Sequence, residues 1–425
     1  MRSVGIRESR VIAVAAALVM AVATLVIVAP AAQAGPSTCQ AKNLTTGAAA
    51  SPDLQVVTDA ASPGDTVQVE GICYGGFTID KTLTVVGEST YAGPEPTLDG
   101  NGVSTVLTLP GDEAVEVTLT NLIITHGAGN GEAGGGISNG SGTVTLNGSS
   151  SVTENIADGG GGGIFNNGGS VVFDDSSRVT GNTADLGGGI YTRYGTVTLN
   201  GSSSVAGNTA GNGGGIYNFF GSASLNDSSS VTGNSGPSGG GILNDGYLTL
   251  HDSASVTANT IAGIVNYGTV VLTGSSSVSG NFNTSGFGGG IFNSNASTVR
   301  LRGSSSVSEN TAFSGGGIYN GGTLTLRGLA SMSGNNARRR GGGIYNSEVS
   351  TVRLRGSSSV SENTARRGGG IYNNVGSTAT LKDSSTVTGN TARRRGGGIF
   401  NNAGVVTLHD SSQVIGNIPD DCVDC

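Results

Sequence analysis

From residue 134 to residue 417, short runs in which apolar and polar residues alternate recur at a nearly constant interval. Each run is three to five residues long and is bounded by Gly, Ser or Asn, which is the pattern of a half-buried strand followed by a turn. Three runs form one unit: T-V-T-L, then S-S-S-V-x-x-N, then G-G-G-I followed by an aromatic residue and Asn. Strands this short cannot bury a core alone, so we expect the units to stack on copies of themselves.

One isoleucine marks each unit and should lie in a single interior file. Nine of the ten intervals between these isoleucines are 26 to 28 residues, and the remaining one is 22. Each strand should pair in parallel with its counterpart in the next unit, and parallel crossovers are almost always right-handed. The sequence therefore predicts an all-β fold: a single right-handed parallel β-helix, or solenoid, with three faces, about 13 coils and a short N-terminal capping helix. The eleven isoleucines are Ile137, Ile164, Ile190, Ile216, Ile242, Ile264, Ile291, Ile318, Ile344, Ile371 and Ile399.

Two Asn positions repeat with the strands and are expected to be structural. One follows the aromatic position in ten of the eleven units, with Thr192 as the exception, and the other ends every S-S-S-V-x-x-N run. Asn tolerates left-handed turn conformations, and stacked amides can hydrogen-bond from coil to coil. The second position predicts an Asn ladder made of Asn155, Asn182, Asn208, Asn234, Asn259, Asn281, Asn310, Asn335, Asn363, Asn390 and Asn417.

The combination of G-G-G-I-[Y/F]-N with V-x-x-N resembles the repeat of the chlamydial polymorphic outer-membrane proteins, which is written GGA[ILV] and FxxN. More broadly, it is similar to secreted bacterial right-handed β-helix repeat proteins. The resemblance covers residues 134–417, and residues 54–126 look like the opening coils of such proteins. Here Gly replaces the repeat Ala and Val replaces the repeat Phe. No C-terminal translocator barrel follows Asn417, so the resemblance does not imply autotransport or outer-membrane anchoring.

The first 34 residues are expected to direct the protein out of the cytoplasm. Three arginines precede an apolar run at residues 11–28, and Ala32-Gln33-Ala34 fits a signal-peptide site cleaved after Ala34. The alternative is an uncleaved anchor, because an apolar run of about 18 residues can just span a bilayer. No second apolar span follows, so we expect a secreted, extracellular protein with no transmembrane domain in the mature chain.

Caps are expected at both ends, because an open β-helix exposes sheet edges there. Near the N-terminus the sequence predicts a helix with Ser51 as its cap and Pro52 at its first position. Its apolar face would consist of Leu54, Val57 and Ala61. The expected segments are a signal peptide at 1–34, an N-terminal cap with lead-in coils at 35–126, eleven repeats of about 26 residues at 127–417, and a C-terminal cap at 418–425.

Four cysteines, Cys39, Cys73, Cys422 and Cys425, are expected to form disulfides in an oxidising compartment. Four cysteines permit three pairings. In an elongated domain only Cys39–Cys73 and Cys422–Cys425 would be within reach. A single C-x-x-C pair without a nearby His is weak evidence for zinc, so no metal site is assigned.

Charge divides the chain into two parts. Residues 35–295 carry 4 basic and 20 acidic residues, a net charge of −16, whereas residues 296–425 carry 14 basic and 8 acidic residues, a net charge of +6. Much of the change falls between the ladder Asn and G-G-G-I, a stretch expected to be an exposed corner loop. In three late coils this corner holds eight arginines, Arg338, Arg339, Arg340, Arg366, Arg367, Arg393, Arg394 and Arg395.

Stacking would gather these eight arginines, the arginine corner, into a column outside the core. One interpretation is that the side chains spread into water, as most surface charge does. The other is an anion-binding site, because planar guanidinium groups suit carboxylates and phosphates. An acidic polysaccharide, a cell-wall or other cell-surface polymer, or a nucleic acid would then be the ligand. The acidic half of a neighbouring copy, in head-to-tail self-association, is a further alternative.

A second column follows the marker isoleucine, where eight of eleven units carry an aromatic residue. If Ile points inward, the next residue should point outward, as a ridge that could stack on sugars. The alternative is that the rings stabilise the sheet by stacking from coil to coil. These residues are Phe165, Tyr191, Tyr217, Phe292, Tyr319, Tyr345, Tyr372 and Phe400.

No catalytic, cofactor-binding or metal-binding residues are assigned. Five aspartates occupy one turn slot that Gly fills in the other six units, and the three His residues are scattered. We therefore expect a secreted or cell-surface, non-enzymatic adhesion or binding scaffold with an Arg-rich C-terminal face for anionic ligands. The alternative is a polysaccharide lyase or glycoside hydrolase, which needs several carboxylates on one face. The sequence does not name a ligand or an oligomeric state.

Overall fold

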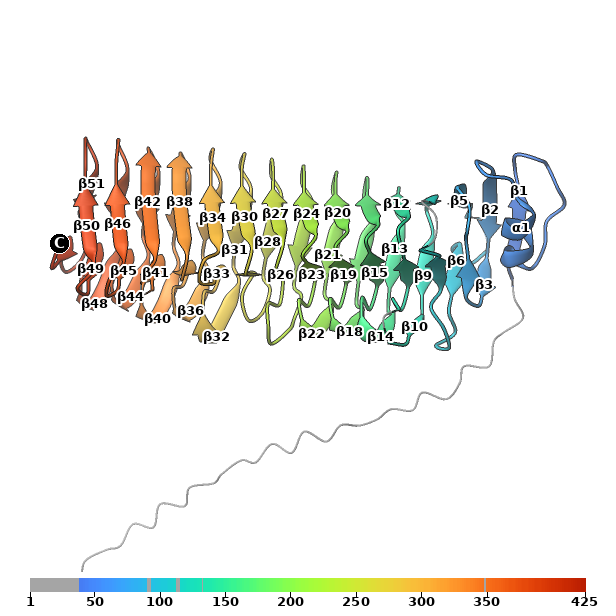
Figure 1. The fold of residues 1–425 in the computed structure, drawn as a ribbon, viewed down its shortest axis with the longest axis horizontal. Coiled ribbons are helices and arrows are strands. Elements are labelled where there is room, and N and C mark those ends of the chain that lie inside the picture. Colours follow the sequence, from blue (N-terminus) through green and yellow to red (C-terminus); the bar gives the residue numbers. More distant parts are fainter. Residues whose placement is uncertain (1–37, 90–92, 112–114, 132, 348) are drawn as a thin grey trace, which may run out of the picture. The chain divides into compact units, whose positions relative to one another are not determined.

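The computed structural model describes residues 38–89, 93–111, 115–131, 133–347 and 349–425, which belong to one compact unit. The expected signal peptide lies outside the described residues. The fold is a right-handed parallel β-helix of about 13 turns with one short helix, as the repeat pattern predicted (Figure 1). Each turn contributes one strand to each of three long sheets, called A, B and C here.

Sheet A contains the T-V-T-L runs. All its strands pair in parallel except β1, which lies antiparallel to β2 at the N-terminal edge. Its strands are β1 (Gln40–Asn43), β2 (Thr66–Glu70), β5 (Leu83–Gly87), β8 (Glu116–Thr120), β12 (Thr143–Asn147), β16 (Ser170–Phe173), β20 (Thr196–Leu199), β24 (Ser222–Leu225), β27 (Tyr247–Leu250), β30 (Thr269–Leu272), β34 (Thr298–Leu301), β38 (Thr323–Gly328), β42 (Thr351–Gly356), β46 (Thr378–Leu381) and β50 (Val405–Leu408).

Sheet B contains the S-V-x runs, in which the central residue faces the core and the two flanking residues face outward along most of the sheet. Its strands are β3 (Ile72–Tyr74), β6 (Thr97–Asp99), β9 (Ile123–Thr125), β13 (Ser151–Thr153), β17 (Arg178–Thr180), β21 (Ser204–Ala206), β25 (Ser230–Thr232), β28 (Ser255–Thr257), β31 (Ser277–Ser279), β35 (Ser306–Ser308), β39 (Ser331–Ser333), β43 (Ser359–Ser361), β47 (Thr386–Thr388) and β51 (Gln413–Ile415).

Sheet C contains the marker isoleucines, which pair in register from Ile137 to Ile399 and are all fully buried, as predicted. Its strands are β4 (Phe77–Thr78), β7 (Leu107–Leu109), β11 (Ile137–Asn139), β15 (Ile164–Asn167), β19 (Ile190–Arg193), β23 (Ile216–Phe219), β26 (Ile242–Asn244), β29 (Ile264–Asn266), β33 (Ile291–Asn293), β37 (Ile318–Asn320), β41 (Ile344–Asn346), β45 (Ile371–Asn373), β49 (Ile399–Asn401) and β52 (Cys422–Val423).

Two short sheets, D and E, lie between sheets B and C, where a loop was expected; the prediction of three faces is therefore incomplete. Their pairing is possible because most of these strands place a small Ala toward the core, and the alanines stack in register, as Ala365 does on Ala392. In the first strand of each short sheet, Gly129 and Asn283 take this position. Sheet D consists of β10 (Ala128–Gly129), β14 (Ile156–Gly160), β18 (Thr183–Leu186) and β22 (Thr209–Asn212). Sheet E consists of β32 (Phe282–Phe287), β36 (Thr311–Ser314), β40 (Asn336–Arg340), β44 (Thr364–Arg367) and β48 (Thr391–Arg395).

The helix near the N-terminus, α1 (Leu54–Ala60), begins later than predicted. Its N-cap is Asp53, whose side chain accepts hydrogen bonds from the backbone N–H groups of Gln55 and Val56. Ser51 cannot serve as the cap, because its backbone is paired with Ala41 of β1 in an antiparallel bridge. The expected apolar face is present: Leu54, Val57 and Ala61 are buried in the main core. Cys39 forms a disulfide with Cys73 beside this region.

The eleven asparagines that end the S-S-S-V-x-x-N runs form one buried file. From Asn155 to Asn390, each side-chain Nδ2 donates to the Oδ1 atom of the Asn one coil later, at 2.9–3.1 Å. The same Oδ1 atom also accepts the backbone N–H of the preceding Asn, at 2.9 Å between Asn281 and Asn310. A second file, after the aromatic position, has the same side-chain linkage, for example from Asn346 to Asn373 at 2.8 Å, with Thr192 in place of one Asn. Both files fix the register of adjacent coils.

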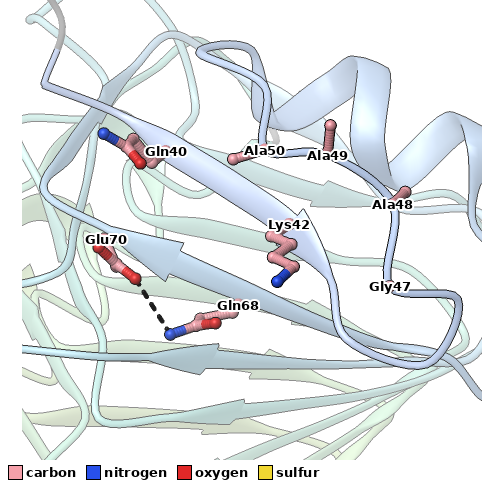
Figure 2. Close-up of a pocket in the computed structure, with 8 residues that line it drawn as sticks. All are labelled: Gln40, Lys42, Gly47, Ala48, Ala49, Ala50, Gln68 and Glu70. Atoms are coloured by element: carbon pink, nitrogen blue, oxygen red, sulfur yellow. Dashed lines mark hydrogen bonds between the residues drawn. The ribbon is translucent and has the colours of Figure 1, made fainter.

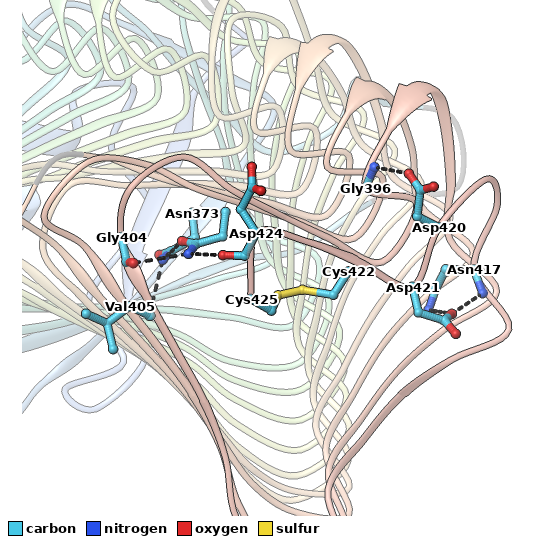
Figure 3. Close-up of a disulfide and its surroundings, with 11 residues drawn as sticks. Asn373, Gly396, Gly404, Val405, Asn417, Asp420, Asp421, Cys422, Asp424 and Cys425 are labelled. Atoms are coloured by element: carbon cyan, nitrogen blue, oxygen red, sulfur yellow. Dashed lines mark hydrogen bonds between the residues drawn. A yellow bond between two sulfur atoms is a disulfide. The ribbon is translucent and has the colours of Figure 1, made fainter.

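The last eight residues close both files of Asn (Figure 3). Asn417 donates to Oδ1 of Asp421 from its side chain and its backbone, at 3.0 and 2.8 Å. Asn401 donates to the carbonyl oxygen of Asp424 at 2.7 Å, and β52 extends sheet C beyond β49. A disulfide joins Cys422 and Cys425 within this segment. Residues 418–425 therefore supply the acceptors that a further coil would otherwise provide.

We predict that Asn310→Ala lowers the free energy of unfolding by about 3 kcal/mol, because it leaves two buried donors of Asn281 without their acceptor. Denaturant unfolding followed by circular dichroism measures this change. Asn167→Ala is the matched control, since Asn167 is exposed on β15, and it should cost less than about 0.5 kcal/mol. Equal losses in the two variants would contradict a stabilising role for the ladder.

Candidate functional site

The arginine corner lies on sheet E, at the ends of β40, β44 and β48. In each strand Ala faces the core and the arginines face outward or lie partly exposed. The last arginine of each strand is in register with the last of the next, so that Arg340, Arg367 and Arg395 form a file. Neighbouring strands in a sheet lie about 4.8 Å apart, so the structure gathers all eight predicted arginines into three adjacent coils.

The glycine that follows each arginine run lets the chain turn inward. Gly341, Gly368 and Gly396 have φ angles of +62°, +62° and +64°, in the left-handed region that favours glycine. A Cβ atom at Gly341 would collide with the carbonyl oxygen of Ile344. This explains why so much charge directly precedes a buried segment: the arginines end an outer strand, and the glycines carry the chain beneath it.

The aromatic column lies directly under this outer strand. Sequence reasoning allowed an outward ridge, but Tyr345, Tyr372 and Phe400 are only 7%, 2% and 9% exposed, so that interpretation is wrong for these coils. The rings stack instead from coil to coil. Centroid distances are 5.0–5.3 Å and interplanar angles 5–16° between Phe292 and Phe400. The physical reason is that the arginine-bearing strands lie over the column, with Arg340 above the ring of Tyr372 and Arg367 above that of Phe400.

Three arginines rest on these or neighbouring rings. The guanidinium carbon of Arg340 lies 5.1 Å from the ring centroid of Tyr372, and that of Arg367 lies 5.7 Å from Phe400. Arg339 lies 5.5 Å from Phe313 in the same way. Guanidinium groups over aromatic faces are attracted by the ring quadrupole, which holds the charges at fixed positions. Burial raises the pKa of the Tyr345 hydroxyl, and the charge and hydrogen bonding of Arg340 partly oppose this shift.

In the described part of the chain, no acid compensates the charge of the corner. Among the described residues, no ion pair within 4.0 Å involves any of its eight arginines. The charge of Arg394 lowers the pKa of the Arg366 guanidinium, and desolvation and two further arginines add to the shift. Arg339, Arg340, Arg366 and Arg367 line a cavity of about 180 Å³. An anion placed there would relieve like-charge repulsion and meet several donors at once.

A second hollow, of about 340 Å³, lies near the N-terminus between β1, β2 and the segment 47–50 (Figure 2). It is lined by mixed polar groups, with one base, Lys42, and one acid, Glu70, whose Oε1 accepts a hydrogen bond from Gln68 at 3.2 Å. One base and one acid do not concentrate charge of a single sign, so this hollow favours neither anions nor cations. The arginine corner is therefore the stronger candidate binding site.

The aligned aspartates serve turns. Asp175, Asp227, Asp252, Asp383 and Asp410 all have positive φ angles. Several carboxylates accept a backbone N–H from the coil before, as Asp383 does from Gly356 at 2.8 Å. Because both Asp and Gly can adopt the positive φ angle that this turn requires, either residue can occupy the position. Among the described residues, no group of three or more His, Cys, Asp or Glu side chains is arranged to hold a metal ion.

Sequence reasoning missed one cluster in the lead-in coils. Nδ1 of His126 lies 3.0 Å from Oδ2 of Asp99, and Nε2 lies 3.5 Å from Oε2 of Glu154. These residues belong to three successive coils, at the end of the sheet B strands. Aligning the lead-in coils in register with the repeats would have revealed the cluster. The histidine is half exposed and faces carboxylates on both nitrogens, which is the arrangement of a surface ion-pair cluster.

Comparison with protein families, with curated proteins and with solved structures found no match. Within the described residues, no helix is both long and apolar enough to cross a membrane. The function proposed below therefore rests on the fold and on the arginine corner.

We predict that Tyr372→Ala lowers the free energy of unfolding by about 3–5 kcal/mol, because it removes a buried ring from the stack and the platform under Arg340. Tyr372→Phe keeps the ring and should change stability by less than about 1.5 kcal/mol. Thermal and denaturant unfolding of the two variants test this. A Tyr372→Ala protein as stable as the Phe variant would contradict the stacking role.

Proposed function

We propose that this protein is a secreted or cell-surface, non-enzymatic binding scaffold whose arginine corner binds acidic polysaccharide. The observation that carries the proposal is the unpaired cluster: eight arginines in three coils, with no ion pair to a described carboxylate. Guanidinium forks fit carboxylate or sulfate groups bidentately, and the rings beneath Arg340 and Arg367 hold their guanidinium groups in place.

The setting of the site is consistent with a role outside the cell. Two disulfides are typical of exported proteins, and the first 34 residues have the pattern of a signal peptide. The repeat also resembles that of chlamydial polymorphic outer-membrane proteins, which supports a cell-surface adhesion role. A polysaccharide lyase or hydrolase is the less favoured alternative, because the aligned aspartates of the repeats are engaged in turns rather than gathered in a groove.

The test is a binding array of acidic, sulfated and neutral polysaccharides, probed with the native protein and with a variant in which all eight corner arginines are Ser. The native protein should retain the acidic polymers selectively, and the variant should bind them at least about tenfold more weakly. An all-Lys variant keeps the charge but loses the fork and should bind with intermediate strength. Unchanged binding by the Ser variant, or equal binding of neutral polymers, would overturn the proposal.

Release of reducing or unsaturated sugars from the same polysaccharides decides between scaffold and enzyme. The scaffold proposal predicts no product above a buffer control during prolonged incubation. Turnover that survives in the eight-Ser variant would instead place an active site elsewhere on the chain.

The separation of negative and positive charge along the chain also favours a second candidate function, which is self-association. The net charges of −16 for residues 35–295 and +6 for residues 296–425 would attract one copy to another. Light scattering should then show oligomers at low salt that dissociate near 0.5 M salt, because screening shortens the range of the attraction. The eight-Ser variant should remain monomeric at low salt; a salt-independent mass would exclude this candidate.

A further inference from the structure

A second row of cations runs along a different edge of the solenoid, at the turn from sheet A to sheet B. Each cation directly follows a buried leucine that ends the inward pattern of sheet A. The strand pairing places these leucines in register, and Arg327 and Arg355 are themselves direct partners. The row, called the basic row here, consists of Arg302, Arg327, Arg355 and Lys382.

The basic row is built differently from the arginine corner. It places one basic residue in each of four consecutive coils, and with coils about 4.8 Å apart it extends for about 15 Å. In the earlier coils the same position is occupied by Asp174, Asn200, Asn226, His251 and Thr273, so the row is specific to the C-terminal half.

The side chains of the row are accessible. Arg302, Arg327 and Arg355 are exposed, and Lys382 is partly exposed. Within the described part of the chain, no carboxylate lies within 4.0 Å of their charged nitrogens. The turn residue after each of the three arginines is Gly rather than Asp, so that no acid stands next to them in sequence.

Sheet B provides a second, parallel row beside these cations. In β35, β39, β43 and β47 both outward positions are Ser or Thr, and only the central apolar residue faces the core. The surface therefore offers a line of cations flanking a flat strip of hydroxyl groups, both repeating once per coil. No aromatic side chain occupies these outward positions, so the strip lacks the platform on which nucleic-acid bases stack.

We propose that this surface is a second binding site that takes a linear polyuronate, an unbranched polysaccharide with one carboxylate on every sugar. Such a chain, laid along the solenoid axis, would pass neighbouring coils about 4.8 Å apart. Carboxylates that face the basic row would then meet its cations, while the sugar hydroxyls hydrogen-bond the Ser and Thr strip. The proposal deepens the proposed function and rests on it for the class of ligand, but it uses different residues on a different edge.

The test is a calorimetric titration with a galacturonate oligomer of about four sugars, a length chosen to span the four coils of the row. Three proteins are compared: native, a row variant with Arg302, Arg327, Arg355 and Lys382 changed to Ser, and the eight-Ser corner variant. We expect two classes of site in the native protein and one class in each variant. In the corner variant the remaining affinity should rise with oligomer length up to about four sugars, and in the row variant this dependence should be lost, with binding of the tetramer weakened about tenfold at that site.

Three controls distinguish a loss of specific recognition from a general loss of positive charge or a loss of folding. A corner variant with only Arg338, Arg339, Arg393 and Arg394 changed to Ser removes the same charge as the row variant and should keep the length dependence. A methyl-esterified oligomer should not bind the row, and circular dichroism should show native folding, because the substituted residues are exposed or partly exposed.

The outcomes decide between the two proposals. If the row variant keeps both classes of site and the length dependence, the second site is wrong, while the proposed function stands. If the eight-Ser variant binds like the native protein but the row variant does not, the corner proposal fails and the row stands. Absence of any oligomer binding to the native protein would overturn both.

Discussion

The structure depends on the hydrogen bonds that tie each buried Asn to the one above it. A buried amide without partners is costly, and each Oδ1 atom here accepts two N–H groups from the preceding coil. A slip of one residue between coils would break this linkage along a whole file and turn the isoleucines away from the core. The surface inherits the same register, so charges that recur in sequence become neighbours in space.

The shared register of core and surface explains how a chain with only 12% charged residues concentrates positive charge. Arginine runs of two or three residues, placed in the same slot of successive units, join into one cluster. The aromatic stack beneath the corner adds rigidity, since Arg340 and Arg367 lie over rings that are themselves fixed from coil to coil. Affinity for an extended anion then follows from repetition, because a polymer with a similar repeat can make the same contact several times.

Much of the fold could be predicted because the regular interval between repeats indicates which residues of neighbouring coils pair. The isoleucine file and the three long sheets follow directly from period and alternation. The short sheet at the arginine corner could not be foreseen, since strands of four to six residues next to triple glycines read as loops. The burial of Tyr345, Tyr372 and Phe400 was missed for a related reason: strict alternation ignores the arginine-bearing strands that lie over this column. The helix cap at Asp53 was misplaced because the pairing of Ser51 with Ala41 is a tertiary contact, which local propensity does not encode. The basic row required exact strand register, and the His126 cluster required the lead-in coils, whose period is less regular.

The most direct test of the account is a cross-link between coils on sheet E. Thr364 and Thr391 are register partners one coil apart, at the spacing of neighbouring strands, which lies within the Cα range that a disulfide requires. Oxidised Thr364→Cys/Thr391→Cys protein should contain one disulfide between the two substituted positions, in addition to Cys39–Cys73 and Cys422–Cys425, by mass spectrometry of the non-reduced digest. The control pair Thr311→Cys/Thr391→Cys, three coils apart, should keep free thiols. Free thiols in the first protein, or an equally rapid cross-link in the second, would contradict the stacked register on which both proposed binding surfaces depend.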